Sequence, residues 1–545
     1  MRRWNGWGKE NTDLTMQLSA GLRQLLGTLL GPGTALPEAS LTQVVDSVPT
    51  SRLKHHKLIS QDPETRVRHA RGQSLPDWLA MRSGDIVTFP DGVAFPTSIE
   101  QVRELLSYAD SFNIVVIPYG GGTSVVGHIN PIVGNLPVLT ISLAKMNQLI
   151  DLDTTSHLAT FGAGAAGPDI EAQLNKQGYT LGHFPQSWEF STIGGWVASR
   201  SSGQQSLHYG RIEQLFAAAD VETPNGSLHI PSIPASSAGP DIREMILGSE
   251  GRLGVITQVT ARVTPLPEEE AFQVVFFPSW EAGLAASRAL VQQRVALSMV
   301  RLSNPLETTS LLYMGAGDNL QAITDLEQSL AKENIASGKV MMTIGVTGSA
   351  QQCHFNKQTA LDICATYGGL ADSSGLADNW AHGRFRAPYL RDPLGSAGYA
   401  VDTMETALNW SDVEHAMDQI EGAIRNALKD EGEQVFVYSH LSHIYGQGSS
   451  IYTTYLFRFA DSYQETLKRW KKLKAAGAKQ ILALGGTISH QHGVGLDHRD
   501  YLEAEKSSLG LGAIISLCDY FDPKGLMNPG KLLPPNKEKS AARDE

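Results

Sequence analysis

The sequence predicts an α+β protein in which helices and strands form more than one domain. Three observations support this fold class. The chain has 545 residues, which is enough for roughly two or three domains with substantial cores. Its 41% hydrophobic and 18% charged residues are an ordinary globular balance. Short apolar runs suited to strands alternate with helical segments, and glycine-rich loops follow several of them.

Residues 1–85 are expected to form an irregular helical lead-in that packs around the next domain. The Leu-Gly-Pro-Gly segment at 30–33 interrupts any helix there. The basic run at 53–57 is most simply a solvated face.

Residues 86–267 alternate short strands and helices, as in an α+β nucleotide-binding domain. One example is a predicted helix over 98–113 that precedes a strand beginning at Ile114. The Pro/Glu-rich segment 265–270 marks the boundary to a second α/β region, residues 268–480.

In that second region, Ser411 and Glu414 have the spacing of a capping box. Helical spacing predicts one buried stripe made of Val413, Met417, Ile420 and Ile424. Residues 481–545 form the last segment.

A glycine-rich loop at 118–127 follows the apolar run 114–117 and reads Pro-Tyr-Gly-Gly-Gly-Thr-Ser-Val-Val-Gly. Because its three glycines have no side chains, backbone N–H groups can approach an anion, and the threonine and serine add hydroxyl donors. The spacing matches neither G-x-x-x-x-G-K-[ST] nor G-x-G-x-x-G. Taken alone, such a loop is more often a tight turn than a phosphate cradle.

Two further segments favour a dinucleotide site. Residues 185–199 place small hydroxyl side chains around the pair Gly194-Gly195, namely Ser187, Ser191, Thr192 and Ser199. Residues 248–256 form a glycine-punctuated loop that runs into a half-buried strand. Three such loops on one chain are better explained by one shared ligand than by three unrelated turns.

In this order, the three segments resemble the FAD-binding domain of the vanillyl-alcohol-oxidase and p-cresol-methylhydroxylase (PCMH) flavoprotein superfamily. Within it, the chain is most similar to the alkyldihydroxyacetonephosphate synthase family, also through Trp4–Gly8 and Gly239–Ile242. The resemblance covers nearly the whole chain. It implies a two-part PCMH-type FAD-binding domain, an α/β substrate (cap) domain and a helical C-terminal segment that returns to the flavin.

The resemblance also implies FAD as the cofactor. The residues expected to bind it are Pro118, Tyr119, Gly120, Gly121, Gly122, Thr123, Ser124, Gln186, Ser187, Ser191, Thr192, Ser199, Arg200, Ser201, Ser202, Glu250, Gly251, Arg252, Leu253, Gly254, Val255 and Ile256. Thr123 stands where covalently flavinylated relatives carry a histidine, which implies non-covalent FAD. The nearby His128 leaves a covalent link open as the alternative.

His490 and His492 are candidates for proton transfer. If this segment is extended, both imidazoles lie on one face with Gln491 opposite. Hydrogen-bonded core histidines are an equally good explanation from the spacing alone. The resembled family has three consecutive histidines here, so Gln491 is a departure, and glutamine cannot take up a proton near neutral pH.

The resemblance assigns roles to three more residues. Tyr452 aligns with the family's catalytic acid or base, although a buried strand tyrosine is the ordinary alternative. Arg391 matches the arginine that binds the substrate phosphate, but a guanidinium suits a carboxylate equally and could pair with Asp392. Arg301 matches a further residue needed for activity.

Two reaction classes follow. The first is a transferase that exchanges the acyl group of acyl-dihydroxyacetone phosphate for a long-chain alcohol through a flavin N5 adduct, as in ether lipid synthesis. The second is an FAD-linked oxidoreductase that acts on a 2-hydroxy acid or a phosphorylated alcohol. Related dehydrogenases bind zinc, but the corresponding positions here are His440, Tyr452 and Gln491, so we expect no metal.

Composition limits the partners. The formal net charge of −12 argues against a nucleic-acid binder, so a small-molecule or lipid-like substrate is expected. The spacing of Cys353, Cys364 and Cys518 fits reduced packing residues. No run of about twenty apolar residues, signal peptide or peroxisomal signal is seen, so we expect a cytoplasmic protein. A homodimer and a peripheral membrane contact are implied by the resemblance alone.

Overall fold

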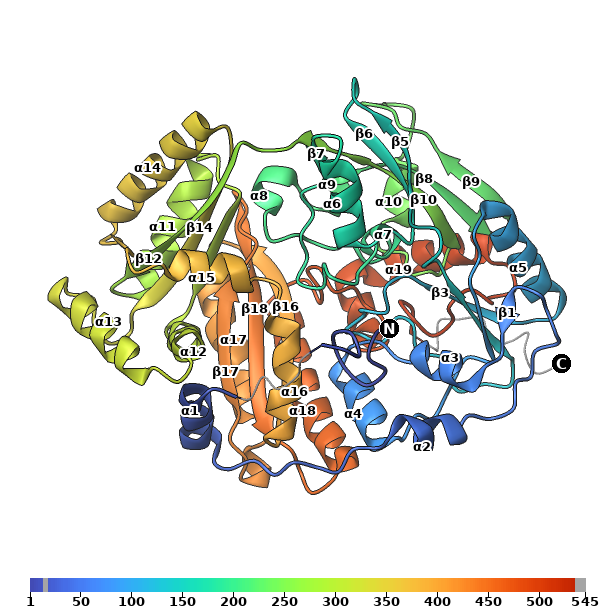
Figure 1. The fold of residues 1–545 in the computed structure, drawn as a ribbon, viewed down its shortest axis with the longest axis horizontal. Coiled ribbons are helices and arrows are strands. Elements are labelled where there is room, and N and C mark those ends of the chain that lie inside the picture. Colours follow the sequence, from blue (N-terminus) through green and yellow to red (C-terminus); the bar gives the residue numbers. More distant parts are fainter. Residues whose placement is uncertain (13–17, 535–545) are drawn as a thin grey trace.

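The computed structural model describes residues 1–12 and 18–534. Figure 1 shows two lobes side by side, one built around a seven-stranded sheet and the other around two smaller sheets. In the part of the chain that the structure describes, no helix is both long enough and apolar enough to span a bilayer.

The first small sheet has the strand order β1 (Ile59–Ser60), β2 (Gly92–Ala94), β4 (Val138–Ser142) and β3 (Val115–Tyr119). Strands β2, β4 and β3 are parallel. Helix α5 (Ile99–Ser111) begins after its N-cap Ser98 and precedes β3, as predicted. The glycine-rich loop therefore leaves the carboxyl end of a parallel strand, which is where ligands bind in open sheets of this kind.

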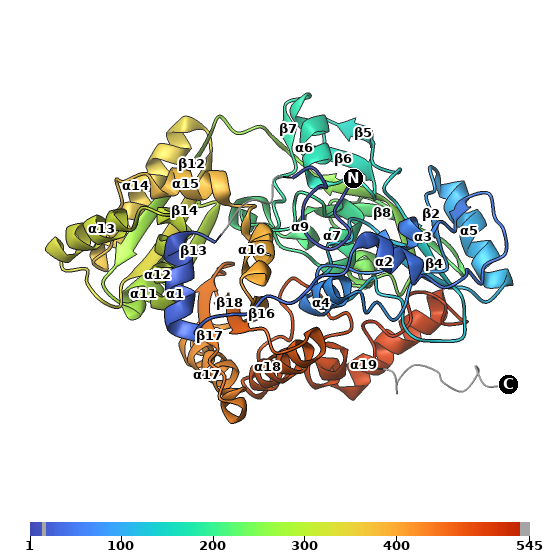
Figure 2. The ribbon, with the colours of Figure 1, turned by 60° about the horizontal axis from the view of Figure 1, so that its bottom comes forward.

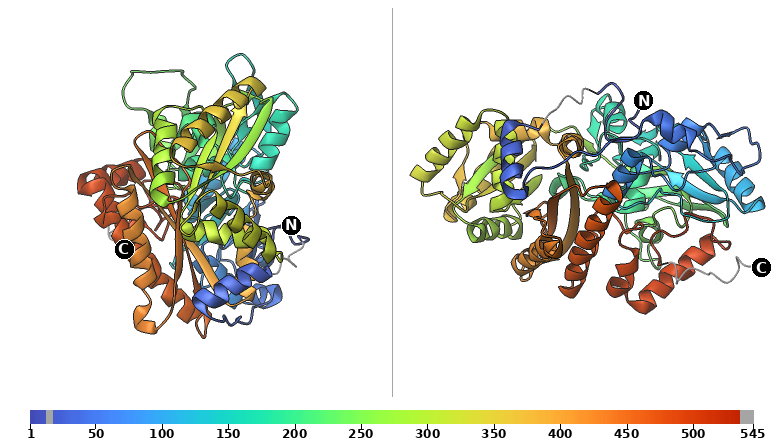
Figure 3. Two further views of the ribbon diagram at one scale, coloured as in Figure 1. Left: turned by 90° about the vertical axis from the view of Figure 1, so that its left-hand side faces the viewer. Right: turned by 90° about the horizontal axis from the view of Figure 1, so that it is seen from below.

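The second small sheet is antiparallel, in the order β5 (Leu149–Asp153), β6 (Leu158–Gly162), β10 (Val255–Arg262), β8 (Phe216–Thr223) and β9 (Gly226–Ile230). Side chains of both sheets share one apolar core, which also receives α7 (Ile193–Ser199) and the C-terminal helix α19 (Leu502–Phe521). Figure 3 shows α19, in red, against this lobe.

The larger sheet runs β15 (Leu370–Ala371), β12 (Glu269–Phe277), β14 (Val340–Gly348), β13 (Met299–Ser303), β17 (Phe436–Leu441), β18 (Gly448–Arg458) and β16 (Tyr399–Asn409). All its neighbouring strands are antiparallel. The helices α11 (Trp280–Gln292), α14 (Ala350–Thr366), α17 (Val413–Asn426) and α18 (Tyr463–Ala483) pack with the sheet in one apolar core.

On β13, β17 and β18, strand alternation leaves the other face of this sheet, here called the free face, available to form a site, whereas α12 (Pro305–Ala316) and α13 (Leu320–Lys332) cover that side at β12 and β14. Val437 and Leu441 of β17 enter the helix-covered core, whereas Tyr438 and His440 point the opposite way. Strands β13 and β18 alternate in the same manner, so polar side chains from three strands face the lobe of the two smaller sheets.

Helix α17 shows one prediction confirmed and one wrong. The stripe over residues 413–424 is buried, as predicted. The capping box of Ser411 and Glu414 does not form, because the helix begins one residue later with Asp412 as its N-cap. The Ser411 hydroxyl donates instead to the Asp412 carboxylate at 2.8 Å.

The first eighty-odd residues reach both lobes. Helix α1 (Ala20–Leu30) packs against α12 (Pro305–Ala316) and the end of the large sheet, as Figure 2 shows. The helices α2 (Leu41–Asp46), α3 (Pro63–Arg68) and α4 (Leu75–Ser83) supply buried residues to a small core beside the first sheet.

Candidate active site

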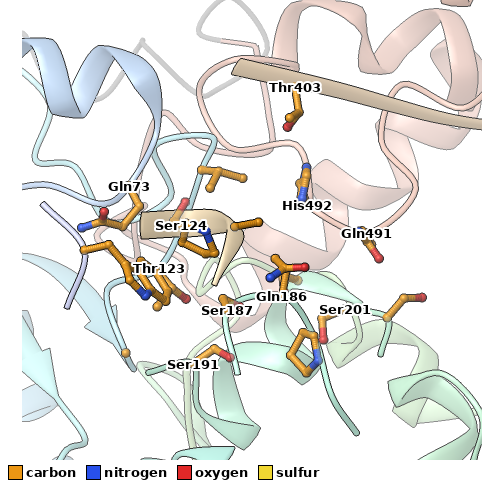
Figure 4. A pocket seen from close by; sticks show the side chains of 18 of the residues that line it. Gln73, Thr123, Ser124, Gln186, Ser187, Ser191, Ser201, Thr403, Gln491 and His492 are labelled. Atoms are coloured by element: carbon orange, nitrogen blue, oxygen red, sulfur yellow. The ribbon is translucent and has the colours of Figure 1, made fainter. Parts of the chain in front are cut away.

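A large cavity lies between the two lobes, and the three glycine-containing segments converge on it. Figure 4 shows several of their side chains directed into this space. The predicted residues that line it are Pro118, Tyr119, Gly120, Gly121, Gly122, Thr123, Ser124, Gln186, Ser187, Ser191, Thr192, Ser199, Ser201, Ser202, Glu250, Gly251, Gly254 and Ile256.

Four of the residues predicted to bind FAD do not line this wall. Arg200 pairs with Glu244 at 3.1 Å on the outer side, and the Arg252 guanidinium donates to the Asn528 carbonyl at 3.3 Å. The side chains of Leu253 and Val255 are in the apolar core. Because the strand after this loop alternates between core and cavity, only part of a continuous segment can face a ligand.

The residues that line this part of the cavity fit a dinucleotide. A Cβ atom on Gly120 would lie 2.4 Å from the Thr192 hydroxyl, and one on Gly121 would lie 1.8 Å from the Phe190 carbonyl oxygen. Bare backbone is therefore required where two of the three segments meet. The buried Ser202 side chain lines the cavity. Hydroxyls and exposed backbone N–H groups are the donors that bind phosphate oxygens.

The three glycine-containing segments, 118–127, 185–199 and 248–256, together form what is called here the cofactor cradle. Glu250 connects this cradle to the C-terminal part of the chain. Its carboxylate accepts the N–H groups of Val494 and Gly495 at 2.5 and 2.8 Å. The Asn528 amide donates to the carbonyls of Glu250 and His128, at 2.7 and 3.0 Å. The last loop of the chain thus holds two walls of the cavity together.

His128 lines the cavity beside the glycine-rich loop. Its Nδ1 lies 3.0 Å from the Ser124 hydroxyl. Its Nε2 lies 3.2 Å from the Glu250 carboxylate but forms no hydrogen bond with any described residue. The non-covalent attachment of FAD therefore stays a prediction.

Tyr452 and His440 lie opposite each other on β18 and β17. Their rings stack with centroids 4.9 Å apart and planes 19° from parallel. The Tyr452 hydroxyl donates to Thr403 at 3.2 Å, and the His492 ring lies edge-on at 5.8 Å. Burial raises the pKa of Tyr452 to about 12. All four residues line the cavity.

Arg301 reaches the same wall through Glu307. Its guanidinium donates to the Glu307 carboxylate at 2.8 Å and lies 3.1 Å from His440 Nδ1. Burial opposes ionisation of Glu307, but the adjacent His440 and Arg301 hold its pKa at about 2. Burial and the Arg301 charge lower the pKa of His440, and Glu307 partly offsets them.

Arg391 lines the cavity next to Tyr452 and has an acidic partner other than the one considered from the sequence. Asp392 pairs with Arg3 at 2.7 Å and with Arg82. Arg391 itself pairs with Asp402 of β16 at 3.1 Å and donates to the Gln73 carbonyl. Its guanidinium is therefore fixed in place at the cavity wall.

His490 and His492 do not share a face, so that prediction is wrong. The segment is a loop, because the Glu405 carboxylate accepts the N–H groups of both Gln491 and His492 at 2.7 Å. Gln491 and His492 line the main cavity, as Figure 4 shows. His490 lies behind them in an adjoining cavity, where its Nε2 is 2.7 Å from the Tyr445 hydroxyl. Burial places its pKa well below the usual range.

Other residues of the site were missed. No local pattern marks Glu307 of α12 or Asp402 and Glu405 of β16. Glu307 and Glu405 contact residues far away in the sequence, His440 and Gln491 respectively. Trp7 could have been predicted as a site residue, because it belongs to the Trp4–Gly8 motif that supported the family resemblance. Its ring lines the cavity, and its Nε1 donates to Glu189 at 3.2 Å. The described residues contain no group of three or more His, Cys, Asp or Glu side chains that could hold a metal ion.

The cavity continues from these polar groups into an apolar arm. Its walls come from α1, α12, the segment before β16 and the free face of the large sheet. The residues of this apolar arm are Leu22, Leu26, Leu311, Met314, Leu390, Leu394, Val401, Phe436 and Leu456.

Comparison with known proteins agrees with this architecture. Residues 90–230 match the model of the FAD binding domain, and residues 266–532 match that of the FAD linked oxidases, C-terminal domain. A solved structure described as alkyldihydroxyacetonephosphate synthase superposes with a TM-score of 0.81 at 25% identity, covering 97% of this chain and 98% of that chain.

Curated relatives give the family. The alkyldihydroxyacetonephosphate synthase of Dictyostelium discoideum is 30% identical over 489 residues, covering 88% of this chain and 79% of that protein. An uncharacterized FAD-linked oxidoreductase of Escherichia coli (strain K12) is 28% identical over 457 residues, covering 82% of this chain and 90% of that protein. The chain is an FAD-dependent enzyme, and it belongs to the alkyldihydroxyacetonephosphate synthase family.

Proposed function

We propose that this enzyme exchanges the acyl group of acyl-dihydroxyacetone phosphate for a long-chain alcohol, which gives an ether-linked product. The observation that supports this most is the single cavity in which Arg391, Tyr452 and His492 adjoin an apolar arm. A substrate with a phosphate at one end and a long chain at the other needs both regions.

Arg391 is proposed to bind the substrate phosphate. A guanidinium can present two parallel N–H donors to phosphate oxygens, and Asp402 and Gln73 fix its orientation before substrate arrives. Asp402 is itself held by the Tyr455 hydroxyl at 3.2 Å and the Trp470 indole at 2.7 Å. The phosphate therefore meets a preorganised group rather than a mobile side chain.

Tyr452 and His492 are proposed to move protons at the reacting carbon. Tyr452 remains protonated at neutral pH, because burial raises its pKa to about 12, so it acts first as an acid. His492 has a depressed pKa because it is buried, which leaves it neutral and able to accept a proton. His490 keeps a supporting role, since it lies behind Gln491 and contacts Arg211 and Tyr445.

Arg301 is proposed to act through Glu307 and His440 rather than directly on phosphate, since its guanidinium is held by that buried carboxylate. Non-covalent FAD would be held by those residues of the segments 118–124, 186–192, 199–202 and 250–256 that line the cavity, and it would supply the reactive ring. A cytoplasmic homodimer that contacts a membrane surface is proposed from the family resemblance, since substrates with long chains partition into bilayers.

The second candidate is an FAD-linked oxidoreductase that acts on a 2-hydroxy acid or a phosphorylated alcohol. Two observations favour it: the similarity to the E. coli oxidoreductase, and the neutral Gln491 at a position where the synthase family carries histidine. Arg391 would then bind a carboxylate or phosphate, and a histidine would take the hydroxyl proton.

The deciding experiment follows flavin absorbance under anaerobic conditions. Acyl-dihydroxyacetone phosphate is added first, then a fatty alcohol, with 2-hydroxy acids and glycerol 3-phosphate in parallel. Loss of oxidised-flavin absorbance that the alcohol restores without oxygen, together with an ether product, supports the transferase. Persistent bleaching by a hydroxy acid or by glycerol 3-phosphate alone refutes the transferase and establishes an oxidoreductase.

A further inference from the structure

His440 forms a buried pair with a carboxylate that the proposed chemistry has not yet used. Its Nδ1 lies 2.8 Å from the Glu307 carboxylate, and both side chains are almost inaccessible, at 7% and 4% exposed. Glu307 is fixed by the N-cap of its own helix, where the Asn304 side chain accepts the Glu307 N–H at 2.9 Å. The pair is thus held by two different elements, α12 and β17.

This pairing selects the tautomer of His440. Since Glu307 has a pKa of about 2, it is ionised and can only accept a hydrogen bond. Arg301 Nη2 also lies 3.1 Å from Nδ1, but it donates to the same Glu307 carboxylate at 2.8 Å. Because Glu307 is the shorter contact of Nδ1, at 2.8 Å, Nδ1 carries the proton and the lone pair is on Nε2. No described residue forms a hydrogen bond with Nε2, and the side chain lines the cavity. A free, basic nitrogen therefore faces the space where substrate binds.

His492 also lines the cavity, with Nδ1 3.3 Å from the Glu405 carboxylate, and it is the residue already proposed to move a proton at the reacting carbon. Two further histidines near the site lack this combination. His443 lies 2.9 Å from the Ser442 hydroxyl through Nδ1 and 3.2 Å from the Gly203 carbonyl through Nε2. His490 is outside the main cavity and is held by Tyr445. Besides Glu307, the titratable or charged groups that face His440 are Arg301 of β13, Tyr452 of β18 and His443 of the following loop.

The position of His440 along β17 suggests which proton it handles. Successive side chains on the cavity face of this strand are Phe436, Tyr438 and His440, so the strand passes from the apolar arm to the polar site. At about 3.3 Å per residue, Phe436 and His440 are roughly 13 Å apart. A long-chain alcohol lying in the arm would present its hydroxyl group beside His440 and Tyr452.

We propose that His440 is a further catalytic residue, the base that takes the hydroxyl proton of the incoming alcohol, with Glu307 as its positioning residue. This inference rests on the proposed function. As the ether bond forms between the alcohol oxygen and the terminal carbon of the dihydroxyacetone phosphate unit, the hydroxyl proton passes to Nε2. Over the whole exchange, the bond between that terminal carbon and the ester oxygen breaks, and its electron pair leaves on the fatty carboxylate. His440 then releases the proton to solvent, and no net oxidation occurs.

The test separates the acyl step from the alcohol step in FAD-loaded enzyme. His440→Asn keeps a side-chain donor for Glu307 but removes Nε2. We expect it to retain FAD and a wild-type absorbance change with acyl-dihydroxyacetone phosphate, while ether formation falls by about 100-fold or more. The matched control is His415→Asn, which changes an exposed histidine of α17 and should keep both steps.

Two results would overturn the assignment: ether formation near the wild-type rate in His440→Asn, or an equal loss of both steps. If wild-type enzyme makes no ether, the proposed function fails first, and the inference fails with it.

A second variant covers the case in which His440→Asn does not fold. Glu307→Gln keeps a hydrogen-bond acceptor but removes the charge that raises the pKa of His440. In a plot of the rate of ether formation against pH, the low-pH limb should therefore move to lower pH. The maximal rate should be smaller because the base is weaker. An unchanged pH profile would contradict the role of His440 as the base, since a merely structural pair would not move that limb.

Discussion

Replacing Gly121 by alanine should selectively weaken FAD binding. The added Cβ would lie 1.8 Å from the Phe190 carbonyl oxygen and 2.7 Å from its carbon, far inside ordinary contact distance. Even a 3.0 Å separation would require backbone movement of more than an ångström. Gly121 does not have a positive φ, so alanine adds no backbone strain of its own. The cost therefore comes from spreading two walls of the cofactor cradle.

Overpacking of this kind costs about 1–3 kcal/mol. At about 1.4 kcal/mol per tenfold change, FAD affinity should fall about 5- to 140-fold. Gly120→Ala should be milder, because its obstacle at 2.4 Å is the Thr192 hydroxyl, a side chain that can rotate. Gly134→Ala is the matched control, since nothing lies within 4 Å of its added Cβ.

The assay is titration of each apo-protein with FAD, followed by flavin fluorescence, with the flavin-to-protein absorbance ratio after purification as a second readout. Thermal unfolding of the apo-proteins separates a local effect on the cradle from global destabilisation. If Gly121→Ala binds FAD as tightly as Gly134→Ala, the close approach of the two segments does not serve cofactor binding and the reasoning is refuted.

Three further predictions concern the polar groups of the site. Arg391→Lys removes the planar two-donor fork, so the KM for the phosphorylated substrate should rise by about tenfold or more in steady-state assays while FAD content stays constant; an unchanged KM would place the phosphate elsewhere. Glu405→Gln retains an acceptor for the backbone N–H groups of Gln491 and His492 but removes a charge that raises the pKa of His492. The pKa of His492, measured by NMR titration of its ring-proton resonances, should therefore fall. An unchanged pKa of His492 would contradict the contact between His492 and Glu405. Burial raises the pKa of Asp497 from 3.8 to about 7, so the folded state resists its ionisation and stability falls as pH rises across that interval. Asp497→Asn should therefore match wild type in urea unfolding near pH 4 and exceed it near pH 8 by up to about 4 kcal/mol, at about 1.4 kcal/mol per pKa unit, whereas equal stability at both pH values would disprove the shift.

The cofactor cradle could be predicted from the sequence because its requirements are local. A run of glycines needs no distant partner to reveal that backbone must be approached closely, and small hydroxyl residues identify the second segment. The limit of this reasoning is visible at Leu253 and Val255. A continuous segment was assigned to FAD, but strand alternation sends these two side chains into the core.

The polar wall around Tyr452 was less predictable because several of its contacts join residues that are distant in sequence. Glu307 and His440 are 133 positions apart, and Glu405 and Gln491 are 86 apart. Asp402 is only 11 positions from Arg391, but the sequence offered the adjacent Asp392, which is paired instead with Arg3 and Arg82. The period-two argument failed at His490 for the same reason. The backbone N–H groups of Gln491 and His492 donate to the Glu405 carboxylate, so this segment is a loop and not a strand. No residue near His490 in the sequence indicates that contact.

The loop around Asn528 also determines how late in folding the cofactor cradle can form. Met527 pairs with Val116 of β3, the strand that leads into the glycine-rich loop, and Asn528 joins Glu250 to His128. Asn528 is 278 positions from Glu250 and 400 from His128 along the sequence. Contacts of such high sequence separation form slowly because a long loop must close first. The cradle is therefore complete only after the segment around Asn528 has folded back onto the two smaller sheets.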